Sequence, residues 1–439
     1  MRSGKKVHVV MLPWLAFGHM VPFLDLSMAL AKRGVHVSFI STPLNILRLP
    51  KIPPNLAPFL QFIPLPLHHP LLPPSAQATV DLPSHQIDHL KSACDALHHP
   101  VRAFVAANNP DYIVVDFFHH WAADLKTPLV IFQVLSAATS LFFLLVGGGG
   151  DKHAMTVPQD AGSKVAYMEH EADAMEQVFI SDGERFGKLL AAASAVAVRS
   201  CDEFEGEAIR SYSEKSGKQI LPVGILPPEI PDRRSASPPW DAVFGWLDGQ
   251  KAKSVVFVGF GSETKLSKEH VHEIAHGLEQ SKLPFLWALR KPEEIDESDH
   301  VLPEGFEERT EGQGVVQMGW APQRELLGHG AIGASLFHAG WGSIIEAMQF
   351  GHVLVFLPFI IDQPLNARMM VDKGLGIEVE RAKDSSFGRG EVAAALTRAI
   401  GDQTLRARTE RAAKDIFTNH KLHDLYLDRL VQFFQDSHN

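Results

Sequence analysis

The most constraining feature of this sequence is an order of segments in which buried strands alternate with helices. Residues 6–13 form an apolar, β-branched run that ends at a proline, which is typical of a buried strand. Residues 22–34 have apolar side chains at helical spacing and stop at a glycine, and residues 35–42 are typical of the next strand. This order predicts a βαβ unit in a parallel sheet that is covered on both faces.

The same order recurs on both sides of a proline-rich segment. In the first half we expect a helix at 86–109, with a break at Pro100. Strands are expected at 111–116 and 128–132, and a run from helix to strand at 189–200. Residues 221–240 contain prolines and little periodicity, which is typical of an interdomain linker. After this segment, strands are expected at 254–262, 284–290, 314–320 and 353–358. Helices are expected at 268–281, 342–351, 388–401 and 422–435.

These patterns predict an α/β protein with two Rossmann-like, doubly wound domains that face each other across a cleft. We assign 1–220 to an N-terminal domain, 221–240 to the linker and 241–420 to a C-terminal domain. Residues 421–439 are expected to form a helix that packs back on the N-terminal domain. Ligands of such sheets bind at the carboxyl ends of the strands, so the cleft is the expected site.

Composition excludes several classes of protein. The chain has 439 residues and a formal net charge of −10, without a long Lys/Arg run, so a nucleic-acid-binding surface is not expected. Its two cysteines, Cys94 and Cys201, form neither a disulfide framework nor a metal set. The sequence contains no run of 18 or more apolar residues, so we expect no membrane span and a cytoplasmic protein.

Aromatic and polar residues gather in one glycine-rich, otherwise apolar segment, 319–363. Trp320 lies at the end of an expected strand, where an indole can either stack on a nucleobase or cap the core. Asp362 and Gln363 follow another strand, where they can bind hydroxyl groups or be ordinary surface residues.

The middle of this segment leads directly into a helix. The sequence there is His338, Ala339, Gly340, Trp341, Gly342 and Ser343, and the backbone N–H groups of a helix start bind anions such as phosphate. Ser343 and Glu346 also have the spacing of a capping box, which is the structural alternative. A sugar diol is a further possible partner for the Glu346 carboxylate.

A second group of polar residues follows the strands of the first half. His19 comes after the first strand, in a loop that opens a helix, and Asp116 ends the strand at 111–116. An aspartate that bonds one imidazole nitrogen fixes the tautomer of a histidine acting as general base. His119 and His120 follow at once and either line a pocket or are buried and satisfied, without metal-ligand spacing.

The ordered set from Trp320 to Gln363 resembles the signature box of plant family 1 UDP-sugar-dependent glycosyltransferases. In this chain the box contains W-A-P-Q, then H-x-G-W-x-S, then E, and ends in D-Q. The segments 13–22, 255–262, 285–292 and 302–310 also look like this family, in the same order. The resemblance covers nearly the whole chain and implies a GT-B-like fold.

The resemblance implies a role for each matching position. Trp320 would stack on uracil, with Ala321 and Gln323 near the uridine, and Glu346 would bind the ribose hydroxyls. The diphosphate would lie against the remaining donor-site positions, which are Ser262, His338, Gly340, Trp341, Gly342 and Ser343. Asp362 and Gln363 would bind the hexose, and a final Gln is associated with glucose. The family usually has Asn or Ser where Gly342 stands, so a side-chain contact near the phosphates would be missing.

In the family, the positions of His19 and Asp116 form a catalytic dyad, and His119 and His120 are candidates for the acceptor pocket. The implied reaction is inverting transfer of glucose from UDP-glucose, most similar to the branch that extends sugars on terpenoid or flavonoid glycosides through a 1,2-linkage. UDP-rhamnose and UDP-xylose are alternative donors. The UDP-sugar is a co-substrate, and no other cofactor or metal is expected.

Two alternatives from other classes remain at this point. A nicotinamide- or flavin-dependent oxidoreductase would need a G-x-G-x-x-G turn, but residues 259–264 contain G-x-G only. A non-catalytic nucleotide-sugar-binding protein would keep the box but would not need His19 together with Asp116. We further expect a monomer, and we interpret the glycine run at 147–150 as a shortened loop.

Overall fold

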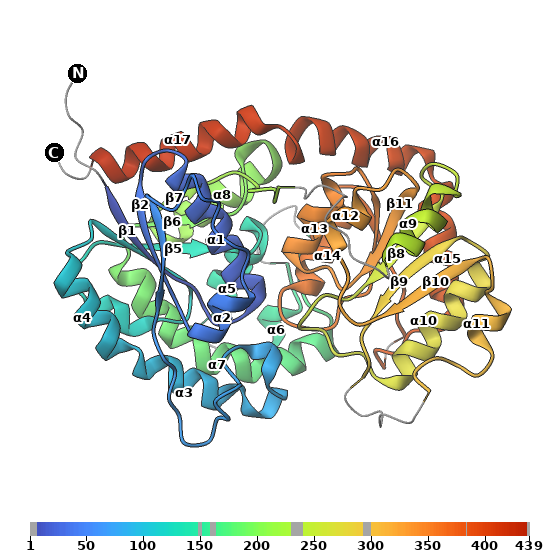
Figure 1. The fold of residues 1–439 in the computed structure, drawn as a ribbon, viewed down its shortest axis with the longest axis horizontal. Coiled ribbons are helices and arrows are strands. Elements are labelled where there is room, and N and C mark those ends of the chain that lie inside the picture. The colour runs from blue at the N-terminus through green and yellow to red at the C-terminus, as the bar shows by residue number, and fades with distance from the viewer. Residues whose placement is uncertain are drawn as a thin grey trace. The chain divides into compact units, whose positions relative to one another are not determined.

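The computed structural model describes residues 7–147, 152–158, 164–229, 240–292, 300–382 and 384–436. The chain divides into two compact units, each built around a parallel sheet (Figure 1). Unit 1 comprises Met1–Lys152, Met175–Leu226 and His420–Asn439, and unit 2 comprises His153–Ala174 and Pro227–Asn419. Both are Rossmann-like, whereas their expected arrangement across a cleft stays a prediction.

The sheet of unit 1 has seven strands among the described residues, in the order β3-β2-β1-β4-β5-β6-β7. The strands are β1 (His8–Leu12), β2 (His36–Ser41), β3 (Leu60–Pro64), β4 (Tyr112–Val115), β5 (Leu129–Gln133), β6 (Ala195–Val198) and β7 (Gln219–Pro222). The chain moves outward from β1 in one direction and then, from β4, in the other. The point between β1 and β4 is therefore the topological switch point, where such sheets bind ligands.

The helices of unit 1 cover both faces of this sheet. They are α1 (Phe17–Ala31), α2 (Pro43–Arg48), α3 (Ile87–Ala96), α4 (His98–Asn108), α5 (Ala137–Val146), α8 (Asp202–Ser216) and α17 (His420–Asp436). Alternate residues of β1 enter different cores: Val10 and Leu12 lie in one cluster, and Val9 and Met11 in the other. Burial on both faces explains why the strands are continuously apolar.

The C-terminal helix α17 packs on unit 1. Leu430 and Phe434 are buried in the cluster that contains Val9, and the rings of Phe434 and Tyr112 are 4.8 Å apart. Arg33, which follows the end of α1, donates hydrogen bonds to Asp424 and Asp428 of this helix. Figure 1 shows α17 in red beside the blue elements of the N-terminus.

Unit 2 has a six-stranded sheet within the described residues, in the order β10-β9-β8-β11-β12-β13. Its strands are β8 (Val255–Gly259), β9 (Phe285–Leu289), β10 (Gly314–Met318), β11 (Ile332–Phe337), β12 (Val353–Phe356) and β13 (Gly376–Glu378). This is again the doubly wound order, with its switch point between β8 and β11. The neighbouring strands pair in parallel throughout the sheet.

The helices of unit 2 alternate with these strands. They are α6 (Lys152–Met155), α9 (Trp240–Asp248), α10 (Lys268–Ser281), α11 (Phe306–Arg309), α12 (Gln323–Leu327), α13 (Trp341–Met348), α14 (Gln363–Asp372), α15 (Arg389–Gly401) and α16 (Gln403–Ala412). Helix α7 (Glu169–Ala192) contains the boundary at which the chain passes back to unit 1. None of the helices in the described ranges is long and apolar enough to cross a membrane.

Three sequence-based boundaries differ from the structure. Helix α1 begins at Phe17, so Pro22 lies inside the helix instead of at its start. The break expected at Pro100 falls at Leu97, and Pro100 lies in the first turn of α4, where a missing N–H costs little. Residues 153–174 belong to unit 2, although they lie within the N-terminal range assigned from the sequence.

Two expectations fall partly outside the described residues. The linker 221–240 is described only as far as residue 229 and again at Trp240, and the glycine run 147–150 is described only at Gly147. The proposed loop shortening therefore stays a prediction.

Candidate active site

The two polar residues of unit 1 meet at the switch point of its sheet. Asp116 directly follows β4, and His19 is the third residue of α1, which follows β1. The His19 Nδ1 atom is 2.8 Å from Asp116 Oδ2, across 97 positions of sequence. The sequence predicts a loop at His19, but the earlier start of α1 puts this residue in the first helical turn.

Asp116 is buried and has three hydrogen-bond donors. Its Oδ2 atom also accepts from the backbone N–H of Trp14 at 3.0 Å, and Oδ1 accepts from the backbone N–H of Phe117 at 2.8 Å. The buried carboxylate is thereby satisfied and directed at the imidazole. Its bond to Nδ1–H places the lone pair of His19 on Nε2, which is the arrangement of a general base.

The next two histidines have different environments. The His119 side chain is fully buried, with Nε2 3.4 Å from Cys94 Sγ, and burial lowers its pKa to about 4. It lies in the core, where an acceptor cannot reach it without rearrangement. His120 is partly exposed, and its Nδ1 atom is 3.2 Å from the guanidinium of Arg185, which also pairs with Asp95 at 2.9 Å.

In unit 2, a turn after β10 presents an aromatic side chain. Strand β10 ends at Met318, and Gly319 adopts a left-handed conformation with φ +95° that glycine tolerates. Trp320 follows, and 75% of its surface is exposed, which argues against a role in capping the core. An indole in this position is available for stacking on a planar ligand.

The carboxylate of Glu346 is oriented by the segment that follows Trp320. Gln323 begins α12, and its Nε2 donates to Glu346 Oε2 at 2.7 Å. The other carboxylate oxygen, Oε1, is 3.8 Å from Arg324 Nε. The structure thus brings the turn at 320–323 and helix α13 together. A ligand that has a planar ring and a diol needs such an arrangement, with an aromatic side chain for the ring and a carboxylate for the diol.

Helix α13 begins at Trp341, with Gly340 as its N-cap. Ser343 is therefore the third residue of the helix and Glu346 the sixth, so the capping box considered from the sequence is wrong. The backbone N–H groups of the first turn, which includes Gly342 and Ser343, have no acceptors within the helix and favour an anion.

Two glycines leave space for His338, which follows β11. A Cβ atom on Gly261 would lie 2.6 Å from His338 Cε1, and one on Gly340 would lie 2.6 Å from Nε2. Gly261 belongs to the loop after β8 that also carries Ser262, whose carbonyl accepts from Arg290 at 3.1 Å. The loops after β8 and β11 therefore converge on His338 at the switch point of unit 2.

His338 is neutral at physiological pH. Burial lowers its pKa to about 4, so it can offer a phosphate an N–H group but not a positive charge. Burial likewise lowers the pKa of His352 to about 3.

This burial predicts a loss of stability in acid. The unfolded chain binds a proton on His338 near pH 6.5, whereas the folded protein does so only near pH 4. The contribution of His338 to the free energy of unfolding is therefore fully present above pH 6.5. It falls as the pH decreases toward 4, by up to about 1.4 kcal/mol per pH unit. Thermal unfolding between pH 7.5 and 4.5 measures the slope, which should be smaller in His338→Gln. Equal slopes in both proteins would contradict the assignment.

Asp362 and Gln363 stand at the start of α14 but differ in accessibility. Asp362 Oδ2 accepts from Asn366 Nδ2 at 2.7 Å, and the same amide donates to the Ala339 carbonyl at 3.1 Å. Gln363 is only 4% exposed. Its Oε1 accepts from the backbone N–H groups of Phe359 and Ile360, and its Nε2 donates to Thr264 Oγ1 at 3.2 Å.

Gln363 therefore joins the loops after β8 and β12 and has little surface for a ligand, whereas Asp362 is partly exposed. Asn366, which fixes the Asp362 carboxylate, is not among the site residues expected from the sequence. Its position four residues after Asp362, on the same face of a helix, is a signal that could have identified it.

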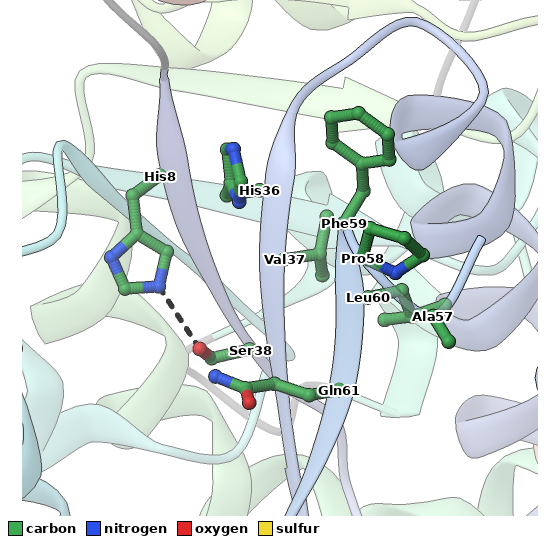
Figure 2. A pocket seen from close by; sticks show the side chains of 9 residues that line it. All are labelled: His8, His36, Val37, Ser38, Ala57, Pro58, Phe59, Leu60 and Gln61. Carbon is green, nitrogen blue, oxygen red and sulfur yellow. Dashed lines mark hydrogen bonds between the residues drawn. The ribbon is translucent and has the colours of Figure 1, made fainter.

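The hollow drawn in Figure 2 lies elsewhere, at the amino ends of β1 and β2. It has a volume of about 370 Å³ and is lined by residues that include His8, His36 and Phe59. His8 Nε2 is 2.9 Å from Ser38 Oγ, shown as the dashed line. Because His19 and Asp116 follow the carboxyl ends of their strands, this hollow is not part of their site.

Comparisons with known proteins identify the family of this chain. The family described as "UDP-glucoronosyl and UDP-glucosyl transferase" matches residues 238–413, and "Glycosyltransferase, N-terminal domain" matches residues 5–227. UDP-glycosyltransferase 91C1 of Arabidopsis thaliana is 38% identical, over 98% of this chain and 96% of its own. Soyasaponin III rhamnosyltransferase of Glycine max is 36% identical, over 99% of this chain and 96% of its own.

A solved structure shows the same fold. The crystal structure of Arabidopsis thaliana UGT89C1 complexed with UDP-L-rhamnose matches with a TM-score of 0.75 and 26% identity, over 98% of this chain and 100% of that one. The fold is therefore GT-B. The family matches exclude the oxidoreductase and the non-catalytic binding protein. The chain is a glycosyltransferase that belongs to plant family 1 of the UDP-dependent glycosyltransferases.

Proposed function

We propose that this enzyme transfers glucose from UDP-glucose to a sugar hydroxyl of a terpenoid or flavonoid glycoside, with inversion and with a 1,2-linkage favoured. The observation that carries the proposal is the 2.8 Å bond between His19 and the buried Asp116. The Glycine max relative, named for rhamnosyl transfer to a soyasaponin, supports a glycoside acceptor. It also favours UDP-rhamnose as the alternative donor, and UDP-xylose is a further one.

The proposed reaction is a single displacement. His19 Nε2 accepts the proton of the acceptor hydroxyl, and Asp116 stabilises the imidazolium that forms. The acceptor oxygen bonds to the anomeric carbon while the bond from that carbon to the diphosphate oxygen breaks. UDP leaves with the electron pair, and the first-turn N–H groups of α13 and the neutral His338 stabilise its charge.

Donor recognition is assigned to residues that unit 2 brings together. We propose that Trp320 stacks on uracil beside Ala321, that Glu346, oriented by Gln323, binds the ribose, and that Asp362 binds the hexose. The diphosphate contacts are proposed for the loop at Ser262 and for the segment from His338 to Ser343. Gln363 acts indirectly, because its amide bonds to Thr264 and to two backbone N–H groups.

The remaining proposals concern partners and location. We propose a monomer that uses the UDP-sugar as co-substrate without a further cofactor, with His120 at the edge of the acceptor pocket. A cytoplasmic location is supported by the two free, buried cysteines, Cys94 and Cys201, which fit a reducing compartment.

Mass spectrometry of reaction products tests the function. The enzyme is incubated with UDP-glucose, UDP-rhamnose or UDP-xylose and with matched glycosides and aglycones, in buffer with and without EDTA. We expect one hexose to be added to a glycoside with UDP-glucose, equally in both buffers. Products from aglycones only, or from UDP-rhamnose only, would overturn the acceptor or the donor assignment. Activity that EDTA abolishes and Mg²⁺ restores would overturn the metal-free mechanism.

A further inference from the structure

The residue directly before Asp362 has an unfavourable backbone conformation. Ile361 has a φ of +52°, in the left-handed region, and 44% of its surface is exposed. A β-branched side chain rarely adopts this conformation, because its Cβ atom crowds the neighbouring backbone. Such a conformation persists only where surrounding contacts enforce it, and it is common at functional sites.

One contact to Ile361 comes from Tyr167, 194 positions earlier in the sequence. The Tyr167 hydroxyl donates a hydrogen bond to the Ile361 carbonyl at 2.6 Å, and Tyr167 is only 3% exposed. Burial, with a smaller contribution from the Asp362 carboxylate, raises the pKa of Tyr167 well above its usual range. The hydroxyl therefore stays protonated and remains a donor.

The segment that carries Tyr167 is anchored on α14, the helix that begins just after Asp362. Arg368 of this helix donates to the Ala166 carbonyl at 2.8 Å. The same guanidinium forms a bidentate pair with Glu171, at 2.7 and 2.9 Å, and both side chains are largely buried. Bidentate pairs of this kind are geometrically specific. The contacts thus form a closed path from α14 through Tyr167 to Ile361 and back to α14.

We propose that Tyr167 is a positioning residue for donor-sugar recognition. Its hydroxyl enforces the Ile361 conformation, and this conformation directs the Asp362 carboxylate toward the hexose. The inference rests on the proposed role of Asp362 in binding the hexose. Uridine and the diphosphate are assigned to other segments of unit 2. Tyr167 is therefore expected to affect the affinity for a UDP-sugar but not for UDP.

The test compares UDP and UDP-sugar binding in Tyr167→Phe by calorimetry, together with steady-state kinetics. UDP-glucose and UDP-rhamnose are both measured. We expect the Kd and KM of the UDP-sugar to rise about tenfold, with kcat and the Kd of UDP within about twofold of the parent, since a ground-state contact is lost. Ile361→Gly in the Tyr167→Phe background should restore the affinity, because glycine adopts positive φ without strain.

Tyr426→Phe is the matched control. Tyr426 is also a buried tyrosine, whose hydroxyl accepts from the Asp202 backbone N–H and donates to Glu203, but it belongs to unit 1. We expect its loss to affect thermal stability without changing the affinity for either nucleotide. If Tyr167→Phe does not fold, Arg368→Lys weakens the same anchor by removing the bidentate pair, and should cause the same sugar-specific loss.

The outcomes separate the inference from the proposed function. Unchanged UDP-sugar affinity in folded Tyr167→Phe or Arg368→Lys would overturn the inference alone. Equal losses for UDP and UDP-sugar would also overturn it, because the effect would then be general. No rescue by Ile361→Gly would overturn it too, because the loss would then not arise from the Ile361 conformation. Failure of the parent enzyme to bind any UDP-sugar would instead overturn the proposed donor site.

Discussion

Replacing His19 by alanine is expected to lower kcat about 10²–10⁴-fold, the usual contribution of a positioned general base. The acceptor hydroxyl then loses the group that accepts its proton during attack on the anomeric carbon. The proposed donor site lies in unit 2, so the Kd of UDP should not change. Release of UDP at saturating donor and acceptor measures kcat, and calorimetry measures UDP binding.

For Asp116, the second member of the pair, we expect non-additive effects on kcat, which a purely structural role would not produce. In the proposed mechanism Asp116 affects the chemical step through His19, so a double variant with Asp116→Asn should be hardly slower than His19→Ala alone. His329 offers a matched control, because its Nε2 atom bonds Asp248 at 3.0 Å in unit 2, outside the proposed site. His329→Ala should retain full kcat. Near-parental turnover in His19→Ala with an ordinary alcohol acceptor would refute the mechanism.

The second large effect is expected from Trp320→Ala, which should weaken binding of UDP about 5–150-fold. Stacking of a base on an aromatic side chain contributes about 1–3 kcal/mol, and this substitution removes the aromatic surface. Because 75% of Trp320 is exposed, its removal creates no cavity, and the melting temperature should be unchanged.

Met318→Ala is the control for this prediction. Met318 is 50% exposed and lies two residues earlier, so the variant removes an exposed apolar side chain from the same region. It should leave the Kd of UDP unchanged. Equal, small effects of the two substitutions would mean that Trp320 does not contact the base. The proposed assignment of the uracil-binding residue would then be wrong.

Much of the fold follows from local pattern. Strand β1 is apolar throughout because both of its faces are buried, with Val10 and Val9 in separate cores. Repeated βαβ units admit few topologies, and the right-handed crossover leaves the doubly wound sheet as the expected one. The edge strands β3 and β13 are not apparent in the sequence, since their residues are less completely apolar.

The meeting of His19 and Asp116 could also be expected from the sequence. Each follows a strand, and parallel strands present their carboxyl ends at the same edge of the sheet. The start of α1 could not be placed, because Pro22 inside the helix looks like a helix start. The orientation of Gln363 could not be read either, since its partners include Thr264, 99 positions away.

The sequence by itself determined the alternation of strands and helices and the order of the donor-site residues, because both depend on neighbours a few positions apart. Only the tertiary structure decided that His119 is buried, that Gln363 bonds to protein, and that residues 153–174 belong to unit 2. The contact between Tyr167 and Ile361 has no periodic signal, because it joins two irregular segments. Such contacts depend on where distant chain segments pack, which local propensity does not encode.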